Sequence, residues 1–130
     1  MQQMKEICEH IRERCEAMDR AREGALATTR RITRNSGDAI KGIHREEWEQ
    51  AERLMEETGG LVEGLHAALE GYPEIYYSGY VEDAQAEFAE VSILYAVLND
   101  RPLPTPQGLN IGNVAYLKGV GDATGELRRR

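Results

Sequence analysis

Four acidic side chains in the second half of the sequence stand at spacings that suit a metal site. Glu87 and Glu90 are three residues apart, and Asp122 and Glu126 are four apart. Residues three and four apart lie on the same face of an α-helix. Carboxylates paired in this way offer the oxygen ligands that Mg²⁺ prefers. The alternative is an ordinary salt-bridged or partly solvated helix face, because Glu is common in helices.

The position of the first pair on its helix makes the metal interpretation more specific. Glu87 falls in the middle of the predicted apolar face and Glu90 on its edge, next to Asp83. An ionised carboxylate on a core-facing stripe is costly unless it is paired or bound to a cation. The apolar face itself is defined by Ala84, Phe88, Val91, Tyr95 and Leu98.

Small residues beside the second pair indicate how the two pairs could meet. Ala115 and Gly119 share a helix strip with Asp122 and Glu126, and small side chains let a second helix approach closely. We therefore expect two packed helices to bring the four acids together around one or two Mg²⁺ ions. Such a site activates water and neutralises the charge that develops during attack on a phosphate.

Basic residues are concentrated in one part of an acidic chain. The net charge is −7, yet residues 20–45 carry seven bases against two acids, which leaves −12 for the remainder. Such asymmetry within one domain can mark a surface that binds a polyanion. We expect five side chains opposite the apolar stripe to contact nucleic-acid phosphates without sequence preference. They are Arg20, Arg30, Arg31, Arg34 and Lys41. The alternative is a solvated face, partly neutralised by Glu23 and Asp38.

The cysteines and histidines are interpreted as ordinary. Cys8 and Cys15 are seven residues apart on one helix, too far for a disulfide, and we expect them to be small, reduced core residues. His10 and His44 are expected in solvent. His66 belongs to a single Glu-x-x-His motif, whereas a di-iron site of that kind needs two.

The hydrophobic pattern predicts an all-α protein. Apolar or small residues recur in steps of three and four over the first 43 residues, which predicts one helix about 60 Å long. A turn is expected at residues 42–45, and further helices at 46–70, 79–98 and from 110 to the last residue. Residues 101–106 should form an irregular link, because three of them are prolines.

These elements indicate a single elongated helical domain over residues 1–130. Long helices with exposed apolar flanks usually find partners, so we expect a homo-oligomer. No stretch approaches the roughly 20 apolar residues of a membrane span, and the N-terminus lacks the apolar core of a signal peptide. We therefore expect a cytoplasmic protein that does not enter membranes.

Two motifs resemble the translin family, and most closely its catalytic branch, translin-associated factor X, in a single-subunit form. Residues 79–92, GYVEDAQAEFAEVS, resemble the glutamate helix of that branch. Residues 114–127, VAYLKGVGDATGEL, are similar to its Asp-Tyr-Leu-x-Gly-Val-x-Asp-x-Thr-Gly-Glu-Leu signature almost position by position. With the basic first helix, the likeness covers nearly the whole chain. The family fold continues for further helices after this signature, so we expect this chain to lack them.

The resemblance implies a translin-like α-α superhelix with a very long first helix, assembled into a closed, octamer-like shell. It also implies that single-stranded RNA is held inside the shell and cut by a Mg²⁺-dependent endoribonuclease site. The family's catalytic, metal-binding acids carry over to Glu87, Glu90, Asp122 and Glu126, each of which keeps an acid at its motif position.

Two other functions remain open on the sequence alone. One is a non-catalytic, translin-like protein that binds single-stranded RNA or DNA. The other is an all-α nucleotide pyrophosphohydrolase, which also places helical acids around Mg²⁺. The sequence contains no Gly-rich phosphate loop and no Ser–His–Asp or Cys–His arrangement.

Overall fold

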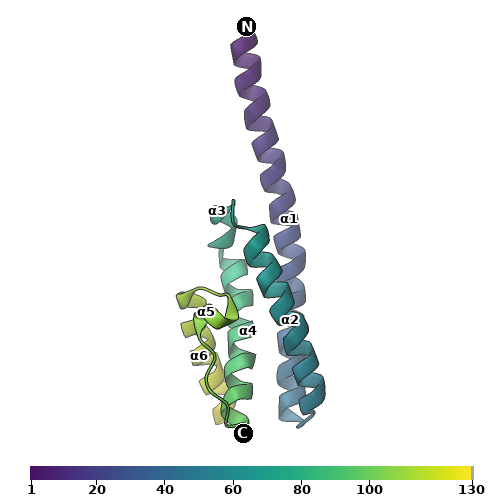
Figure 1. The fold of residues 1–130 in the computed structure, drawn as a ribbon, viewed down its shortest axis with the longest axis vertical. Coiled ribbons are helices and arrows are strands. Elements are labelled where there is room, and N and C mark those ends of the chain that lie inside the picture. Colours follow the sequence, from purple (N-terminus) through teal and green to yellow (C-terminus); the bar gives the residue numbers. More distant parts are fainter. Residues whose placement is uncertain (130) are drawn as a thin grey trace.

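The computed structural model describes residues 1–129, which form six helices and no strand. Four long helices are α1 (Gln2–His44), α2 (Trp48–Ala68), α4 (Gly79–Leu98) and α6 (Asn113–Arg128). Two short helices, α3 (Pro73–Tyr76) and α5 (Pro106–Leu109), lie in the connections. The all-α, elongated architecture predicted from the sequence is confirmed (Figure 1). The expected extension of the last helix to Arg130 lies outside the described residues.

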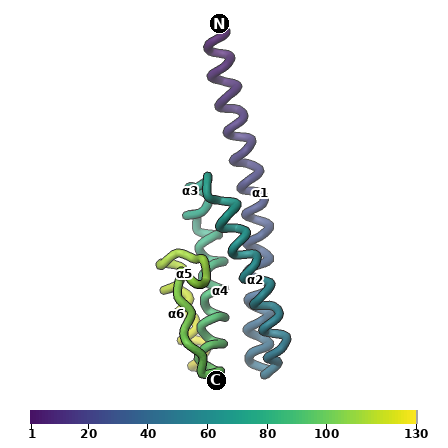
Figure 2. Tube along the Cα trace, in the orientation of Figure 1, coloured from purple at the N-terminus to yellow at the C-terminus, as the bar shows by residue number. Residues whose placement is uncertain are grey.

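Helix α1 is a single 43-residue helix, as predicted, and is about 65 Å long. Its C-terminal half packs against α2 and α4, and its N-terminal half projects beyond the other helices (Figures 1 and 2). The side chain of Arg14 marks the boundary, because its guanidinium donates to the Gly71 carbonyl at 3.0 Å and lies over the Tyr72 ring. The buried residues of α1 all follow this boundary: Ala25, Thr29, Ile32, Ser36, Ala39, Gly42 and Ile43.

The expectation that Cys8 and Cys15 are core residues was wrong. Both are free and exposed, and Ile7 and Ile11, on the same stripe, are 49% and 58% exposed. The stripe keeps its phase along the whole helix, but residues 25–43 of it have helices to pack against and residues 4–11 have none. Sequence periodicity identifies an apolar face and does not identify its partner.

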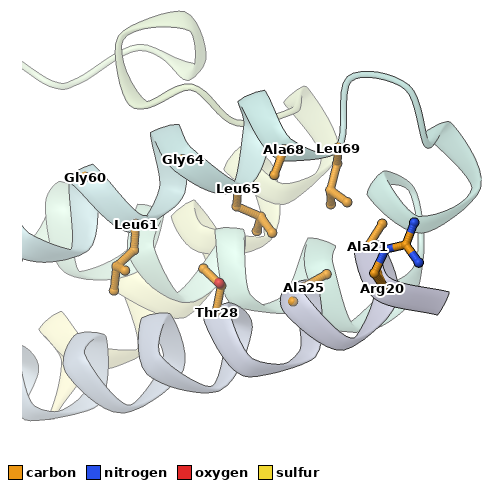
Figure 3. A pocket seen from close by; sticks show the side chains of 11 residues that line it. Arg20, Ala21, Ala25, Thr28, Gly60, Leu61, Gly64, Leu65, Ala68 and Leu69 are labelled. Atoms are coloured by element: carbon orange, nitrogen blue, oxygen red, sulfur yellow. The ribbon is translucent and has the colours of Figure 1, made fainter. Parts of the chain in front are cut away.

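Helix α2 runs back along α1 after a short turn. The predicted turn at 42–45 is displaced, because α1 continues to His44 and the chain reverses at residues 45–47. Glu46 adopts a left-handed φ of 60°, and the Glu47 amide donates to the Gly42 carbonyl at 2.8 Å. On one side of the α1–α2 pair an open groove of about 310 Å³ remains, lined in part by Gly24, Gly60 and Gly64 (Figure 3).

Helix α4 occupies the centre of the bundle and contacts α1, α2 and α6. The apolar face predicted for it was too narrow, since Ala86, Ala89 and Ile93 on other sides are also buried. Its buried residues contribute most of the core together with Ile32, Ile43 and Val62. Glu87 and Glu90 are half-buried, so they lie at the margin of this core and not in the middle of it.

Helix α6 lies alongside α4 and runs in the same direction (Figure 1). A return connection over residues 99–112 makes this parallel arrangement possible, and it holds α5, which the sequence did not predict. The Tyr116 hydroxyl donates to the Pro104 carbonyl at 2.6 Å, which attaches the connection to α6. The Thr105 hydroxyl caps α5 by accepting from the Gly108 amide.

No helix within residues 1–129 is long and apolar enough to span a bilayer.

Candidate nuclease site

The close packing of α4 and α6 depends on small residues, as the sequence predicted. Ala115, Gly119 and Ala123 are the buried residues of α6. A Cβ atom built on Gly119 would lie 2.5 Å from the Ala89 Cβ and 2.9 Å from the Ala86 carbonyl oxygen. No side chain other than the hydrogen of glycine fits there without moving a helix. The backbone of α6 therefore touches α4 directly beside Glu90.

This contact brings the four predicted acids into one neighbourhood. Asp122 acts electrostatically on both Glu87 and Glu90, and Glu126 acts on Glu90. The two helices run parallel, so the acids of α6 follow those of α4 in the same order along the bundle. Glu87 of α4 and Asp122 of α6 thus lie within electrostatic reach of each other.

The environment of this cluster disfavours negative charge. Burial, followed by the neighbouring carboxylates of Asp122, Glu126 and Glu87, raises the pKa of Glu90 to about 7. Burial and the charges of Asp122 and Asp83 also raise the pKa of Glu87. Among residues 1–129, Glu87, Glu90 and Asp122 form no ion pair. Partly desolvated carboxylates that repel one another are suited to bind a cation.

The spacing of the cluster fits a hydrated ion better than a closed cage. In the described part of the chain, no three Asp, Glu, His or Cys side chains converge on one point as metal ligands. Mg²⁺ usually keeps several waters and binds through one or two carboxylates together with substrate phosphates. The donor chemistry at Glu87, Glu90 and Asp122 agrees with that mode of binding.

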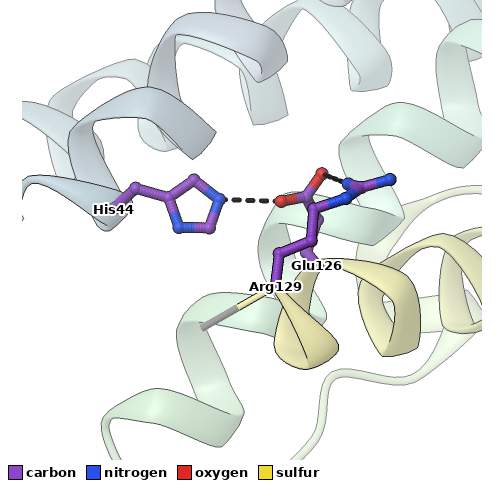
Figure 4. Close-up of polar contacts among 3 residues, drawn as sticks. All are labelled: His44, Glu126 and Arg129. Carbon is purple, nitrogen blue, oxygen red and sulfur yellow. Dashed lines mark hydrogen bonds and ion pairs between the residues drawn. The ribbon is translucent and has the colours of Figure 1, made fainter.

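Glu126 is held differently from the other three acids (Figure 4). One of its carboxylate oxygens pairs with His44 Nε2 at 2.7 Å, and the other accepts from the Arg129 guanidinium. His44 is exposed, as expected, but its pairing with Glu126 was not predicted from the sequence. The sequence could not indicate this contact, because 82 residues separate the partners. The Arg129 contact spans only three residues, a spacing that was available in the sequence.

The neighbouring acids Glu82 and Asp83 are paired with Lys118 of α6. Lys118 Nζ lies 2.6 Å from a Glu82 carboxylate oxygen and 3.7 Å from one of Asp83. The salt-bridge alternative considered for the acidic face thus describes the first two turns of α4. It does not describe the third and fourth turns, where Glu87 and Glu90 lie.

The five predicted basic residues of α1 are all exposed. None of them forms an ion pair within residues 1–129, either with Glu23 and Asp38 or with any other acid. Arg20 lines the α1–α2 groove (Figure 3). At about 100° per residue, Arg30, Arg34 and Lys41 lie on the outer surface of α1, on the same flank as His44.

Comparison with known proteins identifies structural relatives only. No family model and no curated protein matches the sequence. The solved structure described as apo-NeC3PO aligns with a TM-score of 0.85 at 23% identity, covering 94% of this chain and 64% of that one. AfC3PO aligns with a TM-score of 0.84 at 32% identity, covering 94% and 63%.

AfC3PO in a complex with duplex RNA aligns with a TM-score of 0.82 at 30% identity, covering 94% and 62%. This chain thus spans less than two thirds of the length of each of these three structures. At 23% identity the NeC3PO match shows the fold alone, whereas the AfC3PO matches add appreciable sequence similarity.

Proposed function

From the translin-family fold that this chain shares with the C3PO proteins, we propose that it binds RNA and cleaves it in a Mg²⁺-dependent endonuclease reaction. The resemblance to that family noted in the two motifs is confirmed by these relatives. The observation that carries the catalytic part of the proposal is the α4–α6 acid cluster, in which the pKa of Glu90 is raised to about 7.

The proposed chemistry assigns separate tasks to the two charged surfaces. Arg30, Arg34 and Lys41 on α1 bind backbone phosphates, and Arg20 and Arg31 extend that surface. Glu87, Glu90 and Asp122 would hold a Mg²⁺ ion, which would orient a water for in-line attack on the phosphate. The bound ion supplies positive charge to the scissile phosphate. Glu126, whose two oxygens accept from His44 and Arg129, would complete this set as the fourth acidic ligand.

A cleavage assay on labelled RNA tests the catalytic part. Single-stranded and duplex RNA should both be used, since AfC3PO has been solved with a duplex. Glu90→Gln and Asp122→Asn keep the side-chain shapes but remove charge, and we expect each to reduce the cleavage rate by about 100-fold or more. Glu82→Gln is the matched control, because Glu82 lies about two turns before Glu90 on α4, pairs with Lys118 and does not act on Glu87 or Glu90. Cleavage that survives Glu90→Gln and EDTA would refute the proposal.

A second candidate is a translin-like protein that binds single-stranded RNA or DNA without cutting it. The absence of a three-ligand cluster within residues 1–129 favours this candidate. It predicts RNA binding at low salt, no cleavage at any Mg²⁺ concentration, and competition by single-stranded DNA.

The basic surface can be tested independently of catalysis. Replacing Arg30, Arg31 and Arg34 with Ala should weaken RNA binding. It should also make the slope of log K against log[salt] shallower by about two, because each phosphate contact on a single strand contributes about 0.7. The control removes three exposed basic residues outside the packed half of α1: Lys5 at its projecting end, Arg53 and Arg101. Equal affinities for the two triple variants would contradict an RNA path along α1.

Assembly into a homo-oligomer, in an octamer-like shell, is the remaining part of the proposal. The N-terminal half of α1 supports it, because Met4, Ile7 and Ile11 form an exposed apolar stripe of a kind that normally marks an interaction site. Replacing Ile7 and Ile11 with Lys should reduce the mass measured by analytical ultracentrifugation. Glu13→Lys, on the opposite side of the same helix, should leave it unchanged.

A further inference from the structure

The polar contact between the first and the last helix passes through Glu126. Helix α6 packs along α4, whereas α1 packs on α2 and α4. His44, the last residue of α1, reaches across to α6 and places Nε2 at 2.7 Å from Glu126 Oε2 (Figure 4). A carboxylate only accepts hydrogen bonds, so Nε2–H is the donor.

The side chains of Glu126 and His44 differ in how far they are withdrawn from solvent. The Glu126 side chain is only 15% exposed, and the His44 side chain is 34% exposed. Glu side chains lose considerable rotamer freedom when they are fixed. Here His44 and Arg129 each take one oxygen, so the plane and direction of the Glu126 carboxylate are both determined. Arg129 belongs to the same helix end as Glu126, and among residues 1–129 only His44 ties the carboxylate to another element.

His44 also lies where the basic surface meets the acidic cluster. It follows Lys41 by one helical turn on the same flank of α1, and Arg34 lies about 15 Å farther along the axis. RNA phosphates bound to this flank would reach the acids at the His44 end of the helix. Glu126 in turn acts on Glu90 from within the cluster. The His44–Glu126 pair is thus a direct polar contact between α1, which carries the basic surface, and the acid cluster.

We propose that His44 is a positioning residue for this site: its imidazole holds the Glu126 carboxylate, and with it the last turn of α6, against the end of α1. An effect of His44 on RNA cleavage rests on the proposed nuclease function. The ordering of Glu126 and α6 can be measured in the absence of any reaction.

The test uses Mn²⁺ as the probe of the metal site and amide hydrogen exchange as the probe of α6. His44→Ala should lower Mn²⁺ affinity by about 10–100-fold, the range usual for partners of metal ligands, and should accelerate exchange at residues 123–128. His44→Gln keeps an N–H donor, so it should retain most of the Mn²⁺ affinity and most of the protection from exchange at residues 123–128. His10→Ala is the matched control, since His10 is an exposed histidine on the same helix, and it should change neither.

Glu126→Gln and the double variant His44→Ala/Glu126→Gln complete a double-mutant cycle. If His44 acts through Glu126, the double variant should be no weaker in Mn²⁺ binding than Glu126→Gln alone. Multiplicative effects, or unchanged exchange at residues 123–128 in His44→Ala, would overturn the proposal. If the native protein neither binds Mn²⁺ nor cleaves RNA, the proposed function fails, and the exchange data alone then decide whether His44 positions Glu126.

Discussion

The α4–α6 and α1–α2 helix pairs both contain glycines at their contact, with opposite consequences. A Cβ on Gly119 of α6 would collide with Ala89 and the backbone of α4. A Cβ on Gly24, Gly60 or Gly64 would meet no atom within 4 Å outside its own helix, and these glycines line an open groove. Glycine brings the backbones together in the first pair and leaves space in the second.

The difference accounts for the location of the acid cluster. Where α6 lies against α4, carboxylates of both helices are brought within electrostatic reach of one another and are partly withdrawn from water. The α1–α2 groove has mostly apolar and small lining residues, with Arg20 at its edge. We infer that close approach of the helices is the structural requirement for the chemistry.

The largest effect should come from Gly119→Ala. The added methyl group has no space, and overpacking of this kind costs about 1–3 kcal/mol. Separation of the helices should also weaken Mn²⁺ binding. Urea unfolding and Mn²⁺ titration would check both, and an unchanged midpoint with unchanged affinity would contradict the tight-contact interpretation.

A smaller effect is expected from pH. Glu90 has a pKa of about 7 in the folded protein and an ordinary value when unfolded. Between about pH 4.5 and pH 7 the folded state therefore binds more protons, so the metal-free protein should lose stability as pH rises through this window. After allowance for partial exposure, the loss is on the order of 1–2 kcal/mol.

Unfolding measured at pH 5 and pH 8 without divalent ions would test this direction. Glu90→Gln should remove most of the difference, and Mg²⁺ at pH 8 should restore stability to the native protein, because it binds the charged carboxylates. If the free energy of unfolding of the metal-free protein rose from pH 5 to pH 8, ionisation of Glu90 would not be destabilising the folded state.

The smallest effect on stability is expected from a substitution in the open α1–α2 groove. Gly64→Ala fills free space on α2 and should stabilise the protein by about 0.5–1 kcal/mol, since Ala favours the helix over Gly. RNA cleavage and Mn²⁺ affinity should not change. Thermal unfolding is sufficient to measure it. Destabilisation by this substitution would indicate that the α1–α2 groove closes on a partner in the native assembly.

Much of the fold and of the candidate site could be predicted because local sequence rules apply to them. The periodicity of α1 predicted a helix of 43 residues, and the small residues at 115 and 119 predicted the close α4–α6 contact. The short helices α3 and α5 were missed because four-residue helices carry no periodic signal. The core assignment of Cys8 and Cys15 failed because an apolar face does not reveal whether another helix covers it.

The amino-acid sequence by itself determined the four long helices, the acid pairs on α4 and α6, and the basic flank of α1, since each depends on residues within a few turns of one helix. Only the tertiary structure decided that α6 runs parallel to α4, that α1 is bare at one end, and that His44 holds Glu126. Those features depend on which distant faces bury each other, and that choice is made by packing over the whole bundle.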